Sequence, residues 1–202
     1  MHRTLRSKSL ILGVGAIVAL AVTLALHRAG AAQQAPEAAA TPANLSWQAT
    51  IAGPDEPGER LVISGRVFEP NSVTPLAGII VYGYHTDATG HYTRTEAMRP
   101  PRLQGWTKTD ADGRFEFHTI RPAAYPGRTI PAHVHFILWG AGYPRQWAEL
   151  RFEGDPFVTL QMLAEAAAAG QFSTIRPLER GPDGGLRCSV SFRVQRVSNF
   201  KN

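Results

Sequence analysis

Two histidines and two tyrosines are the residues of this sequence best suited to carry out chemistry. His133 and His135 stand two positions apart in the apolar, β-favouring run Ile130-Pro131-Ala132-His133-Val134-His135-Phe136. Alternate side chains of a β-strand share one face, so both imidazoles should point to the same side, with Val134 on the other. The pair supplies half of a metal site, and further ligands must come from elsewhere in the chain.

Tyr92 and Tyr125 are the candidate ligands that would complete such a site. A phenol stays protonated near pH 7 and rarely binds divalent ions. A hard trivalent ion, Fe³⁺ above all, can displace that proton and bind the phenolate. Two tyrosines and two histidines would therefore form an anionic set of two nitrogens and two oxygens that suits ferric iron and leaves positions for a substrate.

Plainer interpretations exist for the same residues. A His-x-His pair alone is a weak signal, because it also arises from cross-strand packing or surface histidines, and it could serve a copper or zinc site without the tyrosines. Tyr92 and Tyr125 could be aromatic residues of the core or of turns. Three other histidines are predicted to lie on turns or solvent-exposed faces: His85, His91 and His118.

The amino-terminal region has the pattern of a targeting segment. Arg3, Arg6 and Lys8 precede an uncharged, largely apolar run over residues 10–26, and small residues follow at 29–32. Residues 1–32 are predicted to be either a cleaved signal peptide or an uncleaved membrane anchor, and the run length leaves both open. In both cases the protein is exported, to the periplasm or the extracellular space, or held at the inner membrane by this segment.

Composition and charge narrow the function of the folded part. The chain of 202 residues is 44% hydrophobic and 18% charged, as expected for a globular protein. Four of the 21 Lys and Arg lie before residue 33, which leaves 17 against 16 Asp and Glu. A nearly neutral domain lacks the basic face that nucleic-acid binding requires, so no nucleic-acid partner is predicted. The lone Cys188 cannot form an internal disulfide and is expected to be a buried apolar residue.

The remaining sequence predicts a mainly β protein, a β-sandwich with long loops and one short helix. Residues 33–46 read as a flexible linker, and 47–202 as the folded domain, irregular over 47–59. Strands are predicted by β-branched and alternating segments over 61–68, 79–84, 114–117, 133–139, 145–152 and 186–197. The helix is predicted over 159–169, an Ala-rich segment that Gly170 closes.

Several of these segments, in this order and spacing, resemble the intradiol ring-cleavage dioxygenases, the catechol and protocatechuate group of non-haem ferric enzymes. The similarity extends from about residue 61 to residue 155. Its pieces are Ser64-Gly65-Arg66-Val67, Tyr84 to Tyr92, Thr109 to Phe115, Ile120 to Tyr125, Pro131 to Phe136, and Phe152-Glu153-Gly154-Asp155. The short spacing from Tyr125 to His133 and the export segment are most similar to the secreted branch.

The resemblance implies roles for the four residues. Tyr92 and His133 match the family's equatorial iron ligands, and Tyr125 and His135 match the axial pair, with Fe(III) as the cofactor. The implied substrates are O₂ and a catechol-type aromatic molecule, whose ring is cleaved between the two hydroxylated carbons to a muconate-type diacid. Tyr125 is further implied to act as a base for one of the catechol protons.

Two positions depart from the family pattern. An arginine commonly stands three residues before the first histidine, and this sequence has Ile130 there. Arg128 is the candidate replacement, a catalytic residue reaching the site from its loop. Glu149 stands where the family usually has glutamine, which would place an acid near the ring and suit a neutral or cationic catechol.

The sequence therefore leaves two classes of function. One is the exported ferric dioxygenase, and the other is a non-catalytic, transthyretin-like sandwich that binds a carbohydrate, a peptide or a protein, because a fold alone does not fix a function. The set of two tyrosines and two histidines favours the enzyme. The particular catechol and the oligomeric state, a homo-oligomer included, are left open.

Overall fold

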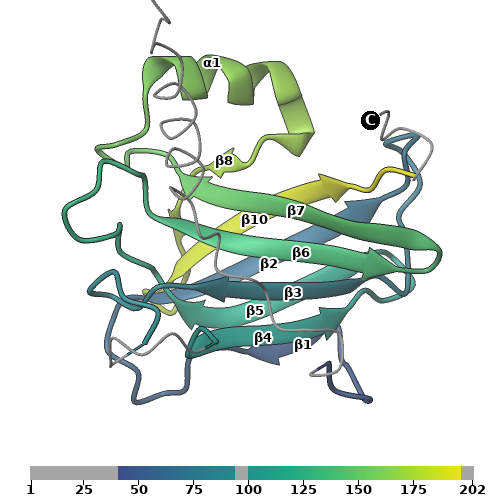
Figure 1. The fold of residues 1–202 in the computed structure, drawn as a ribbon, viewed down its shortest axis with the longest axis horizontal. Helices are drawn as coiled ribbons and strands as arrows, with labels where there is room; N and C mark the ends of the chain where they lie inside the picture. Colours follow the sequence, from purple (N-terminus) through teal and green to yellow (C-terminus); the bar gives the residue numbers. More distant parts are fainter. Residues whose placement is uncertain (1–40, 94–99, 197–202) are drawn as a thin grey trace, which may run out of the picture. The chain divides into compact units, whose positions relative to one another are not determined.

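The folded part of the chain is built from two β-sheets, seen in a computed structural model that describes residues 41–93 and 100–196. Figure 1 shows the two sheets stacked face to face. Sheet A has the strand order β1-β5-β2-β10-β9, and sheet B has the order β4-β3-β6-β7-β8. The predicted mainly β sandwich is thus confirmed.

The strands of sheet A are β1 (Gln48–Thr50), β5 (Arg114–Ile120), β2 (Arg60–Phe68), β10 (Leu186–Arg193) and β9 (Glu179–Arg180). Those of sheet B are β4 (Leu103–Lys108), β3 (Ile80–His85), β6 (His133–Gly140), β7 (Tyr143–Phe152) and β8 (Ile175–Arg176). Most neighbours are antiparallel, but β10 runs parallel to β2, β1 parallel to β5, and β8 parallel to β7.

The hydrophobic core fills the space between the sheets. Four phenylalanine rings lie at its centre with neighbouring centroids 5.2 to 6.1 Å apart, namely Phe115, Phe117, Phe136 and Phe192. Cys188 is buried among these core residues, as expected, and burial raises the pKa of its thiol to about 12. Burial of each large apolar side chain, such as these phenylalanines, stabilises the folded state by roughly 1.5–3 kcal/mol.

Strand β6 is buried on both faces, which matters most for the site. Val134, Phe136 and Leu138 pack into the core between the sheets. The opposite face of sheet B carries a second apolar cluster of Tyr82, Tyr84 and Ile137, against which Tyr92, Trp106 and Trp139 pack. His133 and His135 are only 6% and 8% exposed on this strand.

The predicted helix is confirmed as α1 (Leu160–Ala169), with Thr159 accepting a hydrogen bond from the Met162 N–H at its start and Gly170 at its end. A 3₁₀ turn, η2 (Gly170–Phe172), follows it. Within the described residues, no helix is long and apolar enough to cross a bilayer. The segment predicted as leader or anchor lies outside them, as does most of the predicted linker.

The prediction of an irregular segment over 47–59 was wrong in part, since β1 (Gln48–Thr50) lies within it. This short strand joins the edge of sheet A, and its register pairs Gln48 with Glu116. Strand β4 was likewise not among the predicted strands. Both errors concern strands whose pairing partners lie far away in sequence.

Candidate metal centre

The four candidate ligands converge at the face of sheet B that lies away from the core. The Tyr125 phenol oxygen is 3.1 Å from Nε2 of His133 and 3.3 Å from Nε2 of His135. The two Nε2 atoms are 3.0 Å apart, and the Tyr92 phenol is hydrogen-bonded to that of Tyr125. Two oxygens and two nitrogens thus face one another from three separate segments.

The histidines owe their direction to the start of β6. The Ala132 N–H donates to the buried carboxylate of Asp155 at 3.0 Å, which fixes the backbone just before His133. Nδ1 of His133 lies 2.7 Å from the Pro131 carbonyl. Because a carbonyl only accepts, this nitrogen carries the proton and the Nε2 lone pair faces the tyrosines.

Tyr92 is presented by a tight turn that follows β3. The Asp87 carboxylate accepts from the backbone N–H groups of Thr89 and His91. Gly90 has a φ of 85°, and a Cβ at this position would come within 2.2 Å of the Ala124 carbonyl oxygen. Glycine is therefore required here both by the backbone conformation and by the close approach of the turn to the Tyr125 segment.

The Tyr125 segment is tied to the same turn. The Thr86 hydroxyl donates to the Ala123 carbonyl at 2.7 Å, and the Ala123 N–H donates to the Asp87 carbonyl at 3.1 Å. The two tyrosine-bearing loops are thus linked at Ala123, two residues before Tyr125, and at the start of the turn that carries Tyr92. These two hydrogen bonds hold the loops together on the side of the site where the phenols meet.

Burial sets the protonation of the cluster. It raises the pKa of Tyr92, with a further contribution from the Tyr125 phenol, and it raises the pKa of Tyr125. Burial also lowers the pKa of His133, so its imidazole is neutral, as a metal ligand must be. The phenols therefore keep their protons unless a strong positive charge compensates, and each phenolate, once formed, is a strong base.

Glu149 lies beside the cluster but not within it. One ligand atom each from His133, His135 and Glu149 can be chosen within 4.8 Å of one another, a grouping that could hold a metal ion. However, Glu149 approaches His135 at Nδ1, at 3.3 Å, whereas Tyr125 and His133 approach it at Nε2. The two nitrogens of one imidazole point in different directions, so they cannot serve the same ion, and the tyrosine-containing set is the more complete one.

Aromatic rings surround the second histidine. Tyr84 is buried and stacks on His135, with centroids 4.7 Å apart. Trp147 packs on the same imidazole with centroids 5.1 Å apart, yet 49% of it remains exposed. An exposed indole next to the ligands is a surface on which a flat aromatic molecule could stack.

Arg128, the predicted catalytic arginine, is exposed. Its backbone N–H donates to the Tyr125 carbonyl, but within the described residues no side-chain hydrogen bond or ion pair joins it to the cluster. Ile130 is 41% exposed. The catalytic role of Arg128 therefore stays a prediction. A second arginine, Arg151, is paired in register with His133 and forms an ion pair with Glu149.

The prediction that His85 lies on a turn or solvent-exposed face was wrong. It ends β3 and is fully buried, with Nδ1 2.6 Å from the Thr86 carbonyl and Nε2 2.6 Å from the Thr119 hydroxyl. His91 and His118 are exposed, as predicted. No sequence signal separates His85 from the other two, because its burial comes from strand β5.

Sequence reasoning also missed Arg151, Asp155 and Gly90 as supports of the site. Arg151 could have been noticed, because it shares the strand face of Trp147 and Glu149 by the two-residue period of β7. The roles of Asp155 and Gly90 depend on contacts with segments 23 and 34 positions away, which no local pattern reveals.

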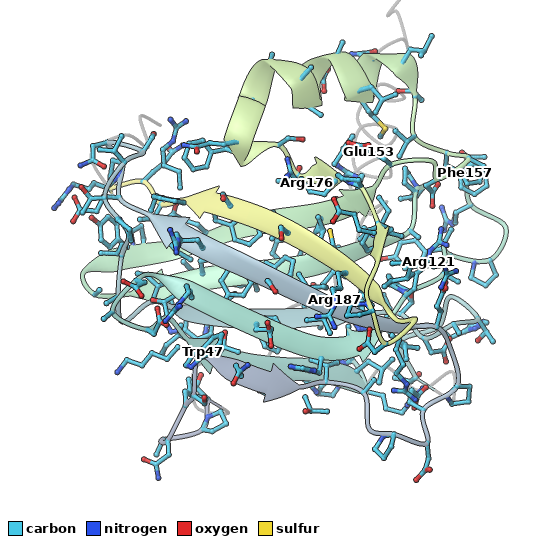
Figure 2. All side chains as sticks on the ribbon, turned by 180° about the vertical axis from the view of Figure 1, so that it is seen from behind. Trp47, Arg121, Glu153, Phe157, Arg176 and Arg187 are labelled. Carbon is cyan, nitrogen blue, oxygen red and sulfur yellow. The ribbon has the colours of Figure 1, made fainter. Side chains whose placement is uncertain are left out.

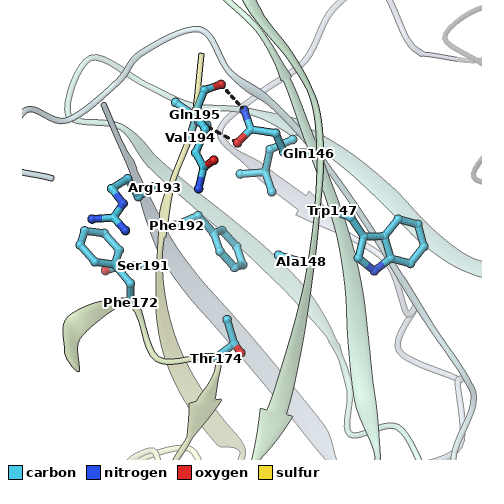
Figure 3. A pocket seen from close by; sticks show the side chains of 11 residues that line it. Gln146, Trp147, Ala148, Phe172, Thr174, Ser191, Phe192, Arg193, Val194 and Gln195 are labelled. Atoms are coloured by element: carbon cyan, nitrogen blue, oxygen red, sulfur yellow. Dashed lines mark hydrogen bonds between the residues drawn. The ribbon is translucent and has the colours of Figure 1, made fainter. Parts of the chain in front are cut away.

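A separate cavity of about 230 Å³ lies between β7 and β10, at the side of the sandwich (Figure 3). Leu138, Ala148 and Phe192 line it, and Gln146 closes one end by hydrogen bonds with the Gln195 backbone N–H and carbonyl. Trp147 is also among the lining residues, but Figure 3 shows its indole directed away from Gln146 and Phe192. The cavity contains none of the four candidate ligands.

Comparison with known proteins agrees with this geometry. A family model described as "Dioxygenase" matches residues 35–196. Catechol 1,2-dioxygenase 1 of Acinetobacter lwoffii is 34% identical over 124 residues, covering 52% of this chain and 40% of the relative. Chlorocatechol 1,2-dioxygenase of Rhodococcus opacus is 32% identical over 143 residues, covering 61% and 53%. The chain belongs to the intradiol ring-cleavage dioxygenase family, and it spans about half the length of these curated relatives.

Solved structures share the fold. The dioxygenase domain of a dioxygenase–carbohydrate-binding protein fusion from Streptomyces sp. SirexAA-E superposes with a TM-score of 0.58 at 22% identity, covering 82% of this chain and 99% of that one. An intradiol ring-cleavage dioxygenase from Tetranychus urticae gives 0.57 at 19% identity, covering 77% and 90%. At these identities the likeness concerns the fold alone.

Proposed function

We propose that this protein is a ferric, non-haem dioxygenase that cleaves a catechol-type ring between its two hydroxylated carbons. The observation that carries the proposal is the convergence of Tyr92, Tyr125, His133 and His135. Two buried phenols whose pKa is raised, facing two imidazoles, form a donor set that a hard trivalent cation satisfies. A divalent ion would leave the phenols protonated.

The four side chains would hold the ion through both phenol oxygens and both Nε2 atoms. Ferric iron bound there would act as a Lewis acid toward the two catechol oxygens and prepare the ring for reaction with O₂. The overall reaction adds both atoms of O₂ to the ring, and the product is a cis,cis-muconate-type diacid.

Tyr125 is the residue assigned to proton transfer. Its phenol oxygen is the centre of the cluster, since it contacts Tyr92 and both histidines. Burial raises its pKa, so its phenolate has a high affinity for a proton and can take one from a catechol hydroxyl. Trp147 would orient the flat substrate by stacking beside His135.

We further propose that the protein works outside the cytoplasm, with residues 1–32 as its signal peptide or anchor. This rests on the charge and apolar pattern of that segment. The full chain is expressed in a Gram-negative host, and its electrophoretic size is measured in each cell fraction. A shortened protein in the periplasm indicates cleavage, and a full-length protein in the membrane fraction indicates an anchor. A full-length protein in the cytosol would contradict both.

The test of function uses iron content, colour and oxygen uptake. Phenolate bound to Fe³⁺ absorbs visible light, so the purified protein should be wine-red with stoichiometric iron. Oxygen uptake is measured with catechol, a chlorinated catechol, hydroxyquinol and protocatechuate, for the wild type, Tyr125→Phe and His133→Ala. We expect uptake by the wild type with at least one substrate and loss in both variants. A colourless, iron-free protein, or equal uptake by all three proteins, would overturn the proposal and favour a binding module.

A further inference from the structure

The strand opposite the two histidines carries two charges in register with them. The β6–β7 ladder pairs His133 with Arg151 and His135 with Glu149. Directly paired residues of adjacent strands project to the same face, so both charged side chains lie on the face of the ligands. Arg151 and Glu149 are also bound to each other, Nη2 to Oε2, with 26% of each side chain exposed.

Glu149 contacts the side of His135 that faces away from the phenols. Its Oε1 lies 3.3 Å from Nδ1 of His135. The contact does not meet the geometry of a hydrogen bond, and this buried Nδ1 has no other hydrogen-bond partner among the described residues. The other carboxylate oxygen is bound to the guanidinium of Arg151, whose positive charge favours the ionised form of Glu149.

The two histidines then have matching surroundings. Each has Nδ1 next to an oxygen, the Pro131 carbonyl for His133 and the Glu149 carboxylate for His135, and each has Nε2 directed at Tyr125. Imidazoles that bind metals generally donate their second N–H to such an oxygen, which fixes the tautomer and the ring orientation. One oxygen of the Glu149 carboxylate contacts His135, and the other contacts Arg151.

We infer that Glu149 is the positioning residue of His135 and that Arg151 acts through Glu149, by holding its carboxylate against Nδ1. The negative charge of Glu149 is then directed at the imidazole and the guanidinium, and it is not a free acid facing the substrate. The inference rests on the proposed ferric site and assigns these two residues a function in it.

The experiment measures the iron affinity of folded protein by competition with a chelator, together with the wavelength of the visible band. Glu149→Ala should weaken iron binding roughly 10- to 100-fold, the usual cost of losing such a partner, and should shift the band. Glu149→Gln should lie nearer to the wild type, because its amide oxygen can still accept from Nδ1–H. Arg151→Gln should give a smaller loss than Glu149→Ala.

The double variant tests whether Arg151 acts through Glu149. Combined with Glu149→Ala, the Arg151→Gln change should cause no further loss, since residues that act through one contact are not additive. Arg145→Gln is the matched control, because Arg145 is exposed on the same strand face as Arg151 and packs over Trp139 instead. It should keep wild-type affinity and colour.

Two results would overturn the inference while leaving the function in place. One is a red, active wild type whose Glu149→Ala variant keeps the same affinity and band. The other is a full additional loss from Arg151→Gln in the Glu149→Ala background. If Glu149→Ala does not fold, Glu149→Gln and Arg151→Gln carry the test, and wild-type affinity and band in both would overturn it. A wild type without colour or iron overturns the ferric site itself.

Discussion

Strands β6 and β10 have the same length but differ in how their two faces are buried. Strand β10 alternates strictly between buried residues such as Cys188 and Val190 and outward ones such as Arg187, which Figure 2 shows on the solvent-facing side of sheet A. Strand β6 is buried on both faces from His133 to Leu138. A strand with one solvated face tolerates polar residues at no cost, whereas β6 must desolvate two imidazoles. Burying an imidazole costs free energy unless polar groups contact it, so His133 and His135 need partners that exposed residues of β10 do not. These partners are the phenols, a carbonyl and a carboxylate.

The largest effect should come from removing a ligand on the β6 side and comparing it with a histidine on sheet A. His133→Ala should abolish stoichiometric iron binding. It should also lower the rate of oxygen uptake by more than the roughly 10- to 100-fold loss that is typical when a residue that only orients a ligand is removed. His118→Ala, on the exposed face of β5, should change neither. Iron analysis and oxygen uptake measure both. Equal iron content in the two variants would remove the distinction between the two faces.

A smaller loss is expected when the two tyrosine loops are forced apart. Gly90→Ala combines a positive φ with a Cβ 2.2 Å from the Ala124 oxygen, whereas Gly142→Ala has a φ of 83° with nothing within 4 Å. Both should lose roughly 1 kcal/mol of unfolding free energy from backbone strain. Only Gly90→Ala should lose more and also weaken iron binding. Chemical unfolding and chelator competition check this, and equal behaviour of the two variants would contradict it.

The buried His85 should make the fold sensitive to mild acid. Burial lowers its folded-state pKa to about 4, below the unfolded value near 6.5, so the unfolded chain binds the proton more readily in that interval. The free energy of unfolding should fall from pH 6.5 toward pH 4, by up to about 1.4 kcal/mol per pH unit from this group. Urea unfolding of wild type and His85→Gln measures it. Parallel pH curves for the two proteins would show that His85 does not contribute.

The smallest effect is expected at Arg128. Because its side chain is exposed and contacts no described ligand, Arg128→Ala should leave iron affinity unchanged and alter the rate of oxygen uptake less than Arg151→Gln does. Steady-state oxygen uptake with the best catechol compares the two variants. A larger loss from Arg128→Ala would mean that its loop moves over the site when substrate binds, as the sequence prediction requires.

Much of the fold follows from local patterns. The alternation of β10, the β-branched runs of β2 and β3, and the Ala-rich helix closed by Gly170 were all predicted, because each depends on neighbours within a few positions. The short strands β1, β8 and β9 were not, because so few residues carry a pattern and each forms only by pairing with a distant strand.

The sequence by itself determined the donor set of the proposed site: two tyrosines and two histidines, in an order and spacing that indicate the family. Only the tertiary structure decided which nitrogen of each imidazole faces the phenols and that His85 is buried. It also showed that Glu149 and Arg151 are paired with each other beside His135. The reason is physical: the identity of a ligand lies in its side chain, whereas its orientation and protonation depend on contacts that strand register and loop packing create between segments far apart in the chain.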